Sequence, residues 1–357
     1  MIPLIVDLET EWRGGQNQAL LLLRGLYERG HAAELIAPQG SALSQRAAAE
    51  GIYVHPVQQR LLRLRAAAMI RRVLRDGRIE LVHVNEPHAL TSAWLAGAHR
   101  KVPLLVSRRV AYRIQGPKRY LAAQRVLAIS RFVKESLVGS GIPEERIELV
   151  YEGVEVPAPV TAEMRASARS RWGVSGQETL LGCVGYLLPE KGQAFLVKAL
   201  PSLLAKHPAT KLILAGDGPC RTELEAYCKA NGLADKVIFA GFITEIAQAY
   251  AALDVFVFPS IAEPLGTSLL AAMAWGLPVV AVASGGVPEY VESGKTGLLV
   301  ERPEAELLAG ALLQILDDGE FRRKLGQAAR DAIRTRLTAE KMVDNTLAVY
   351  EQLTGGR

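Results

Sequence analysis

The sequence predicts an α/β protein of two domains, each with a parallel β-sheet covered by helices. Short apolar, β-rich runs alternate with segments of helical periodicity along all 357 residues. Near-continuous apolar strands separated by helices are typical of parallel sheets that are buried on both faces. The length also favours two domains, because a domain usually contains ~150 residues.

The first half is expected to form one of these domains. Its predicted strands are, in order, IPLIVDL, AELIAP, ELVHVN, PLLVS, RVLAIS and IELVYE. Helical patterns lie between them at 16–29, 60–75 and 89–99. Residues 153–161 are rich in glycine and proline and lack periodicity, so we expect the interdomain linker there.

The second half repeats the alternation of strands and helices. Its predicted strands are TLLGCVGYL, KLILAG, KVIFAG, DVFVFP, PVVAVA and GLLV, with helices at 193–206, 221–231, 246–253 and 267–275. We therefore predict domains at 1–155 and 162–335, and a terminal segment, 339–357, whose helix could cross back to the first domain. Two such domains are expected to face each other across a cleft, because ligands of these folds bind at the carboxyl ends of the strands.

One loop of the second domain has the composition of an anion-binding site. Glu263 lies just past the strand at 254–258, and Gly266 follows it. Thr267 and Ser268 begin the next helix, so free N–H groups and the positive end of the helix dipole would face the loop. A diphosphate suits that environment, and a carboxylate accepts hydroxyl donors, which together describe a nucleotide sugar. The alternative is an ordinary βαβ unit with a polar loop.

Composition restricts the cellular setting. The three cysteines lack metal-ligand spacing, and their odd number argues against a disulfide framework, so a reducing cytoplasm is expected. The N-terminal sequence MIPLIVDLETEWRGG lacks the basic region and cleavage site of a signal peptide. No apolar run reaches the ~20 residues that a membrane span needs. A peripheral position on the inner face of the cytoplasmic membrane remains compatible with these features.

Charge is distributed unevenly between the halves. Residues 1–150 contain 22 basic and 13 acidic residues, whereas the remainder contains 20 and 24. A basic first half indicates an acidic partner, and the absence of zinc or RNA-binding aromatic motifs disfavours nucleic acid. The segment RLLRLRAAAMIRRVLR at 60–75 combines apolar residues with six arginines. It could contact an anionic membrane, or it could be a core-packed helix with a solvated basic face.

A dinucleotide-dependent oxidoreductase is disfavoured. The first loop reads EWRGGQ and a later one reads GDGPCR, and neither has the Gly-x-Gly-x-x-Gly pattern that a dinucleotide fold requires. A non-enzymatic sugar- or phosphate-binding module stays open as an alternative of a different class.

The ordered motifs resemble the retaining family 4 glycosyltransferases. These motifs are VGYLLPEKG, LILAGDGP, VIFAGF, DVFVFPSIAEPLG, AMAWGLPVVA, SGGVPE and SGKTGLLV, preceded in the first half by a GG loop, LVHVNEP, AISRFVKESL and VYEGVE. The resemblance covers nearly the whole chain. It implies the GT-B architecture of two facing Rossmann-like domains, with acceptor binding in the first domain and donor binding in the second.

The residues at the strand ends, together with the resemblance, indicate the site. We assign catalytic roles to Glu263, Lys191 and Arg108. The donor-binding set is Gly14, Gly15, Gly185, Tyr186, Gly216, Phe242, Leu265, Gly266, Thr267, Ser268 and Glu289. On the acceptor side we place Arg109, His83 and Asn85, although a structural role is the alternative for the histidine.

The chain departs from the family pattern at two donor positions. The second glutamate of the family's Glu-x7-Glu motif, which holds the nucleotide ribose, is Ala271 here, and an expected arginine is Tyr186. Arg108 or Arg109 could supply the charge lost at Tyr186, and Glu289 could replace the ribose carboxylate or merely stabilise its loop. The other interpretation is a catalytically decayed protein.

The implied chemistry needs few protein groups. Stabilisation of the leaving diphosphate is expected to be the main catalytic contribution, with Lys191, the helix start at Thr267 and the Gly14–Gly15 amides as candidates. No Asp-x-Asp occurs, so we expect no metal and no cofactor beyond the nucleotide-sugar substrate. The acceptor is expected to be a glycolipid or saccharide of the cell envelope, as in lipopolysaccharide or polysaccharide biosynthesis.

Overall fold

The computed structural model describes residues 1–355, which form two compact units. Unit 1 contains Met1–Gly153 and the segment that starts at Thr338, and unit 2 is Val154–Leu337. The backbone N–H of Val154 donates to the Leu337 carbonyl over 3.0 Å, so the two residues at which unit 2 begins and ends are hydrogen-bonded to each other.

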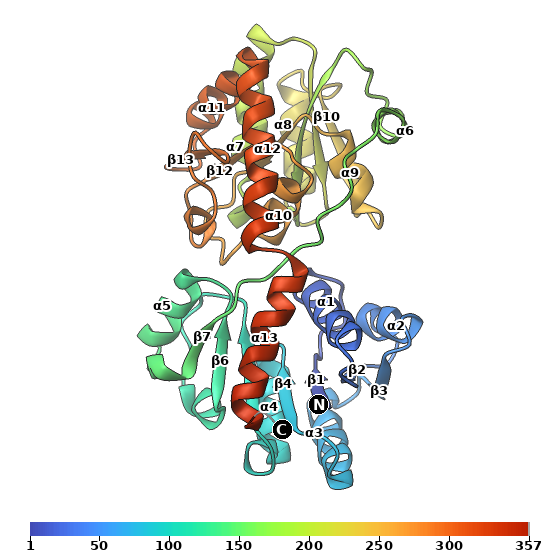
Figure 1. Ribbon diagram of the computed structural model, residues 1–357. Coiled ribbons are helices and arrows are strands. Elements are labelled where there is room, and N and C mark those ends of the chain that lie inside the picture. Colours follow the sequence, from blue (N-terminus) through green and yellow to red (C-terminus); the bar gives the residue numbers. More distant parts are fainter. Residues whose placement is uncertain (356–357) are drawn as a thin grey trace. The chain divides into compact units, whose positions relative to one another are not determined.

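Unit 1 contains a seven-stranded parallel sheet with the order β3-β2-β1-β4-β5-β6-β7 (Figure 1). Its strands are β1 (Pro3–Val6), β2 (Glu34–Pro38), β3 (Tyr53–Val57), β4 (Leu81–Val84), β5 (Leu104–Arg108), β6 (Arg125–Ala128) and β7 (Ile147–Leu149). Most of these strands are fully buried, as their apolar sequences predict, because helices cover both faces of such a sheet.

The helices of unit 1 include one from the far end of the chain. They are α1 (Gly14–Glu28), α2 (Ala42–Ala49), α3 (Leu62–Val73), α4 (Pro87–Ala96), α5 (Arg131–Gly139) and α13 (Ala339–Thr354). Figure 1 shows α13 beside α1. They pack so closely that a Cβ on Gly25 would lie 2.5 Å from a methyl group of Val343. Tyr350 is fully buried against the sheet, so α13 is part of the unit 1 core.

Unit 2 contains a six-stranded parallel sheet with the order β10-β9-β8-β11-β12-β13. Its strands are β8 (Thr179–Val184), β9 (Thr210–Ala215), β10 (Val237–Gly241), β11 (Val255–Phe258), β12 (Val279–Val282) and β13 (Leu298–Val300). Its helices are α6 (Ala162–Ser170), α7 (Gln193–Lys206), α8 (Arg221–Ala230), α9 (Ile246–Ala252), α10 (Thr267–Ala274), α11 (Ala305–Asp317) and α12 (Gly319–Arg336).

Both sheets reverse their strand order near the centre. In unit 1 the chain runs outward from β1 to β3 and then returns to place β4 on the other side of β1. In unit 2 the same reversal occurs between the neighbouring strands β8 and β11. Helices leave such a point in opposite directions, so the carboxyl ends of the two central strands form the usual ligand-binding crevice of a doubly wound sheet.

The predicted strands are confirmed in both units, with one omission. The edge strand β3 (Tyr53–Val57) was not predicted, because its sequence YVHPV is polar, half exposed and interrupted by proline. The expected GG loop is also corrected: Gly14 and Gly15 are the first residues of α1 rather than loop residues. Within residues 1–355, no helix has both the length and the apolar character needed to cross a membrane.

Candidate active site

The carboxyl ends of β8 and β11 in unit 2 bring a lysine and a glutamate together. Lys191 ends a short 3-10 helix, Pro189–Lys191, after β8, and Glu263 lies in the loop after β11. The Lys191 ammonium lies 2.6 Å from Glu263 Oε2. Glu263 is 8% exposed, whereas the lysine side chain keeps about a third of its surface open. A cation and a carboxylate that can accept hydrogen bonds therefore lie side by side at the strand reversal of this sheet.

Serine side chains hold the Glu263 loop against its neighbours. The Ser260 hydroxyl lies 3.0 Å from Glu263 Oε2 and 3.3 Å from the Glu190 carbonyl. Ser284, after β12, donates to the Ser260 carbonyl over 2.8 Å. Because these bonds join the loops after three different strands, the position of the Glu263 carboxylate is set by the sheet rather than by a mobile loop.

Helix α10 starts at the residue that the sequence predicted. Gly266 caps this helix at φ +94° and packs against the Phe258 ring, so Thr267 is its first residue. The buried Tyr290 hydroxyl donates to the Leu265 carbonyl over 2.6 Å and fixes the residue before the cap. Burial, followed by the charges of Glu263 and Glu289, raises the pKa of the Tyr290 phenol well above its usual value, so this donor stays protonated. Ser268 is half-buried in the first turn.

The other donor-side predictions fall at the same edge of the unit 2 sheet. Gly185 and Gly216 follow β8 and β9 and approach so closely that a Cβ on Gly216 would lie 2.0 Å from the Gly185 carbonyl oxygen. Tyr186 and Phe242 are exposed residues that follow β8 and β10, at 39% and 61%. Glu289 ends the 3-10 helix Val287–Glu289 after β12 and is half-buried.

Unit 1 has a polar network at the corresponding reversal of its own sheet. Asp7, Asn85 and Arg109 directly follow β1, β4 and β5. The Arg109 guanidinium donates to Asn85 Oδ1 over 2.7 Å and to Glu152 Oε1 over 2.6 Å. The Asn85 amide in turn donates to Asp7 Oδ2 over 2.8 Å. The network reaches the start of α1, because the Gln16 amide donates to Asp7 and a Cβ on Gly15 would lie 3.4 Å from the Arg109 side chain.

The structure places Arg108 and His83 away from any open surface. Arg108 is 7% exposed and donates to the Tyr120 hydroxyl and the Tyr112 carbonyl, so its guanidinium is engaged within unit 1. His83 is fully buried between the Tyr350 and Ser107 hydroxyls at 2.7 and 2.8 Å, and burial lowers its pKa to about 3. That geometry matches the structural alternative for His83. Arg109 lies in the polar network, whereas two N–H groups of Arg108 are engaged within unit 1, and its catalytic role stays a prediction.

Sequence reasoning did not identify four members of this network and its surroundings. They are Asp7, Gln16, Glu86 and Glu152. The signal was present for Asp7, a single acid directly after a buried strand. Glu86 caps α4 with its carboxylate, and burial raises its pKa to about 7. The Glu86 carboxylate, one oxygen of Glu9 and one ring nitrogen of His88 lie within 4.8 Å of one another, a cluster that the sequence spacing does not indicate.

Comparison with known proteins identifies the family. Residues 164–332 match the model of glycosyl transferases group 1, and residues 12–156 match the model of glycosyltransferase family 4. A GDP-mannose-dependent alpha-(1-6)-phosphatidylinositol monomannoside mannosyltransferase of Mycolicibacterium smegmatis is 30% identical over 89% of this chain and 90% of that protein. A match to an uncharacterized glycosyltransferase of Methanocaldococcus jannaschii, also 30% identical, spans 64% of this chain and 60% of that protein.

A solved structure supports the fold. Anabaena Alr3699/HepE, crystallised with UDP and glucose, superposes with a TM-score of 0.87 at 22% identity and covers 98% of this chain and 99% of its own. The family models fall on the two halves that the sequence motifs indicated. The chain therefore belongs to the family 4 glycosyltransferases of the GT-B fold, and it is a glycosyltransferase.

Proposed function

We propose that this enzyme transfers a sugar, with retention of configuration and without a metal ion, from a nucleoside-diphosphate donor to a glycolipid or polysaccharide of the cell envelope. The observation that supports this most is the 2.6 Å pair of Lys191 and Glu263 at the strand reversal of unit 2. Glu263 would accept the donor sugar's hydroxyl groups, and Lys191 would neutralise phosphate oxygens. The mannosyltransferase relative carries a GDP-mannose donor and a lipid acceptor in its name.

The proposed reaction exchanges two bonds at the sugar carbon. The bond from the anomeric carbon to the diphosphate oxygen breaks, and a bond to the acceptor oxygen forms on the same face. The acceptor proton passes to the departing diphosphate, so no separate protein base is required. Positive charge develops on the sugar and negative charge on the diphosphate. Lys191 and the N–H groups at the start of α10 would stabilise that negative charge.

The donor nucleotide can be tested through the residue that departs from the family. Ala271 lies half-buried in α10, where alanine is a good helix former, so a glutamate can replace it without disturbing the helix. We expect Ala271→Glu to tighten binding of a nucleoside diphosphate about tenfold, because a charge-assisted hydrogen bond to the ribose is worth ~1.5–3 kcal/mol. Glu289→Ala is expected to weaken it, since Glu289 would hold the ribose in the natural chain.

Calorimetric titration of UDP and GDP into wild type, Ala271→Glu and Glu289→Ala measures these changes in nucleotide affinity. A thermal-shift panel of nucleotide sugars, followed by a transfer assay with the best of them, tests the proposed function itself. If no nucleotide sugar stabilises the protein and none is consumed, the proposal fails. If donors bind but both substitutions are silent, the ribose is held elsewhere and only the ribose assignment is lost.

A lipid-linked acceptor is supported by an exposed surface on unit 1. Helix α3 buries Ala66, Ala67, Ile70 and Val73, so it does pack on the core. Leu61, which precedes the helix, and Leu64, in its first turn, are nevertheless 63% and 60% exposed. Arg60, Arg63 and Arg65 are exposed beside them. Apolar side chains amid arginines suit the headgroup region of an anionic membrane, so we propose that the enzyme works peripherally at the cytoplasmic face.

We expect the wild-type protein to co-sediment with vesicles that contain anionic phospholipid and to bind neutral vesicles weakly. Leu61→Ser/Leu64→Ser should reduce binding to anionic vesicles about tenfold or more, because each leucine loses ~1.5–3 kcal/mol of apolar burial. Met164→Ser, at an exposed apolar position of unit 2, serves as the matched control and should change nothing. Binding that ignores both lipid charge and the leucine substitutions would exclude this surface.

A further inference from the structure

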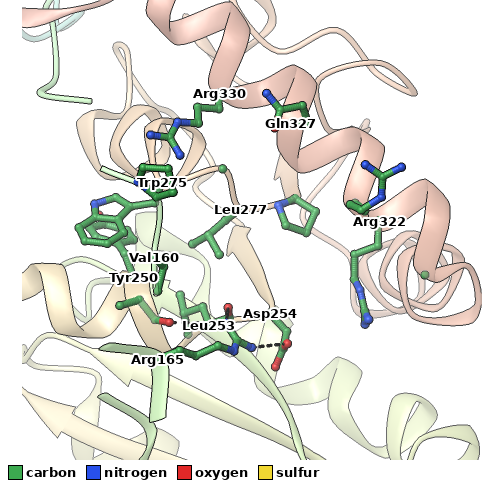
Figure 2. A pocket seen from close by; sticks show the side chains of 16 residues that line it. Val160, Arg165, Tyr250, Leu253, Asp254, Trp275, Leu277, Arg322, Gln327 and Arg330 are labelled. Atoms are coloured by element: carbon green, nitrogen blue, oxygen red, sulfur yellow. Dashed lines mark hydrogen bonds and ion pairs between the residues drawn. The ribbon is translucent and has the colours of Figure 1, made fainter. Parts of the chain in front are cut away.

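We propose that unit 2 has a second binding site, for a nucleoside phosphate, at the edge of its sheet opposite to Lys191 and Glu263. An open pocket of about 540 Å³ lies there, lined by residues of unit 2 (Figure 2). Asp254 and Leu253 precede β11, and Leu277 and Pro278 precede β12, so the pocket is at the amino ends of these strands. Glu263 lies beyond the carboxyl end of β11, and the four residues of this strand alone span roughly 13 Å at ~3.3 Å per residue.

The pocket is strongly basic. Arg165, Arg322, Arg323 and Arg330 line it, and Asp254 is its acidic member. Asp254 is already saturated, because Arg165, Arg169 and the Leu180 backbone N–H all donate to its carboxylate at 2.6, 3.0 and 2.8 Å. The charges of the remaining arginines are therefore not balanced by the wall of the pocket, and an anion is the ligand that would balance them.

Three arginines of α12 retain donors for that anion. In the part of the chain that the structure describes, the guanidinium groups of Arg322 and Arg323 make no ion pair or hydrogen bond. Arg330 donates one N–H to the Pro157 carbonyl, but its Nε is buried without a partner among those residues. Figure 2 shows Arg322 and Arg330 projecting from the same helix beside the pocket.

The opposite wall is apolar and aromatic. Trp275 lines the pocket, is partly buried, and stacks its ring on the buried Tyr250 with the centroids 6.2 Å apart and the planes at 21°. Leu277 and Val160 extend this wall (Figure 2). A rigid indole beside unpaired guanidinium groups suits a planar base joined to a phosphate, and the volume falls within the ~300–1,000 Å³ of small-molecule sites.

The position of the pocket gives this ligand a route to regulation. Pro159 and Val160, which line it, belong to the chain that enters unit 2 after Val154. Arg330 also lines an adjoining pocket with Val156, Pro157 and Ala158, and α12 leads to the exit of unit 2 at Leu337. A ligand bound between α12 and residues 156–160 would hold the first segment of unit 2 against its last helix. This inference does not depend on the proposed glycosyl transfer.

Calorimetric titration of guanosine 5′-monophosphate into wild type, Lys191→Ala and Arg322→Gln/Arg330→Gln tests the site. We expect a binding event that persists in Lys191→Ala, where the opposite site is damaged, and that weakens at least tenfold in the double arginine variant. Lys324→Gln is the matched control, since Lys324 lies on α12, pairs with Glu320 and is absent from the pocket wall; binding should stay within twofold of wild type.

Two further probes separate the base from the phosphate. Trp275→Leu should weaken guanosine 5′-monophosphate at least fivefold and leave glucose 6-phosphate unchanged if the base rests on the indole. If Arg322→Gln/Arg330→Gln does not fold, Arg322→Gln alone, which removes no internal bond, should still weaken binding at least threefold. Equal affinity of wild type and the arginine variants overturns the proposal. Equal loss of both ligands in Trp275→Leu overturns the assignment to a nucleoside phosphate.

Discussion

Lys191→Ala is expected to lower kcat/KM for the nucleotide-sugar donor by about 30- to 1,000-fold, which corresponds to ~2–4 kcal/mol. Lys191 is the cation beside Glu263 at 2.6 Å, and hydrogen bonds to charged phosphate oxygens are among the strongest in proteins. The substitution also leaves the buried Glu263 carboxylate with the Ser260 hydroxyl and without its positive partner. The loss should therefore appear both in donor affinity and in kcat, because negative charge on the diphosphate increases in the transition state.

Steady-state kinetics on two control variants show whether the loss is specific to the charge at position 191. Lys198→Ala removes an exposed lysine from the following helix, α7, and should keep wild-type turnover. Lys191→Arg keeps the charge and should recover part of the activity, although the planar guanidinium does not reproduce the ammonium geometry. Wild-type kcat/KM in Lys191→Ala would remove this residue from the donor site.

The sequence was most informative where a buried strand ended in a single chemically distinct residue. Glu263 was predicted to be a site residue because an acid followed the apolar run DVFVFP and preceded a glycine and a helix start. The structure places it at a strand reversal, which the sequence alone could not reveal, since the reversal depends on which strands pair. The contact between Glu263 and Lys191 joins residues 72 positions apart and follows from that pairing.

The predictions for unit 1 depended on the directions in which side chains point, which the sequence does not give. Arg108 and Arg109 follow the same strand, and neighbouring side chains of an extended chain point to opposite faces. In the structure Arg108 is buried and donates to the Tyr120 hydroxyl, whereas Arg109 donates to Asn85 and Glu152. Both residues fit the sequence equally well. Only the packing of the segment that follows β5 decides which of the two arginines is buried and which lies in the polar network.

Gly285→Ala is expected to lower the free energy of unfolding by ~2–4 kcal/mol and to lower kcat/KM at least 100-fold. Gly285 lies at φ +53°, and a Cβ there would sit 1.9 Å from the Glu263 carbonyl oxygen. The next residue, Gly286, donates its N–H to that same oxygen over 3.0 Å, so the two loops touch backbone to backbone. Relief of the overlap requires the Glu263 main chain to move by about 1 Å, and such a shift at the proposed catalytic carboxylate can cost ~100-fold in rate.

Gly294→Ala separates this overlap from the general strain of a left-handed alanine. Gly294 also has a positive φ, +79°, but nothing lies within 4 Å of the position that its Cβ would occupy. It should therefore lose only the ~1–2 kcal/mol of left-handed strain and keep its turnover. Chemical denaturation and donor kinetics on both variants make the comparison. The variants share the strain and differ in the contact with Glu263. If Gly285→Ala keeps its turnover as Gly294→Ala does, the Glu263 loop tolerates displacement, and catalysis does not depend on the exact position of Glu263.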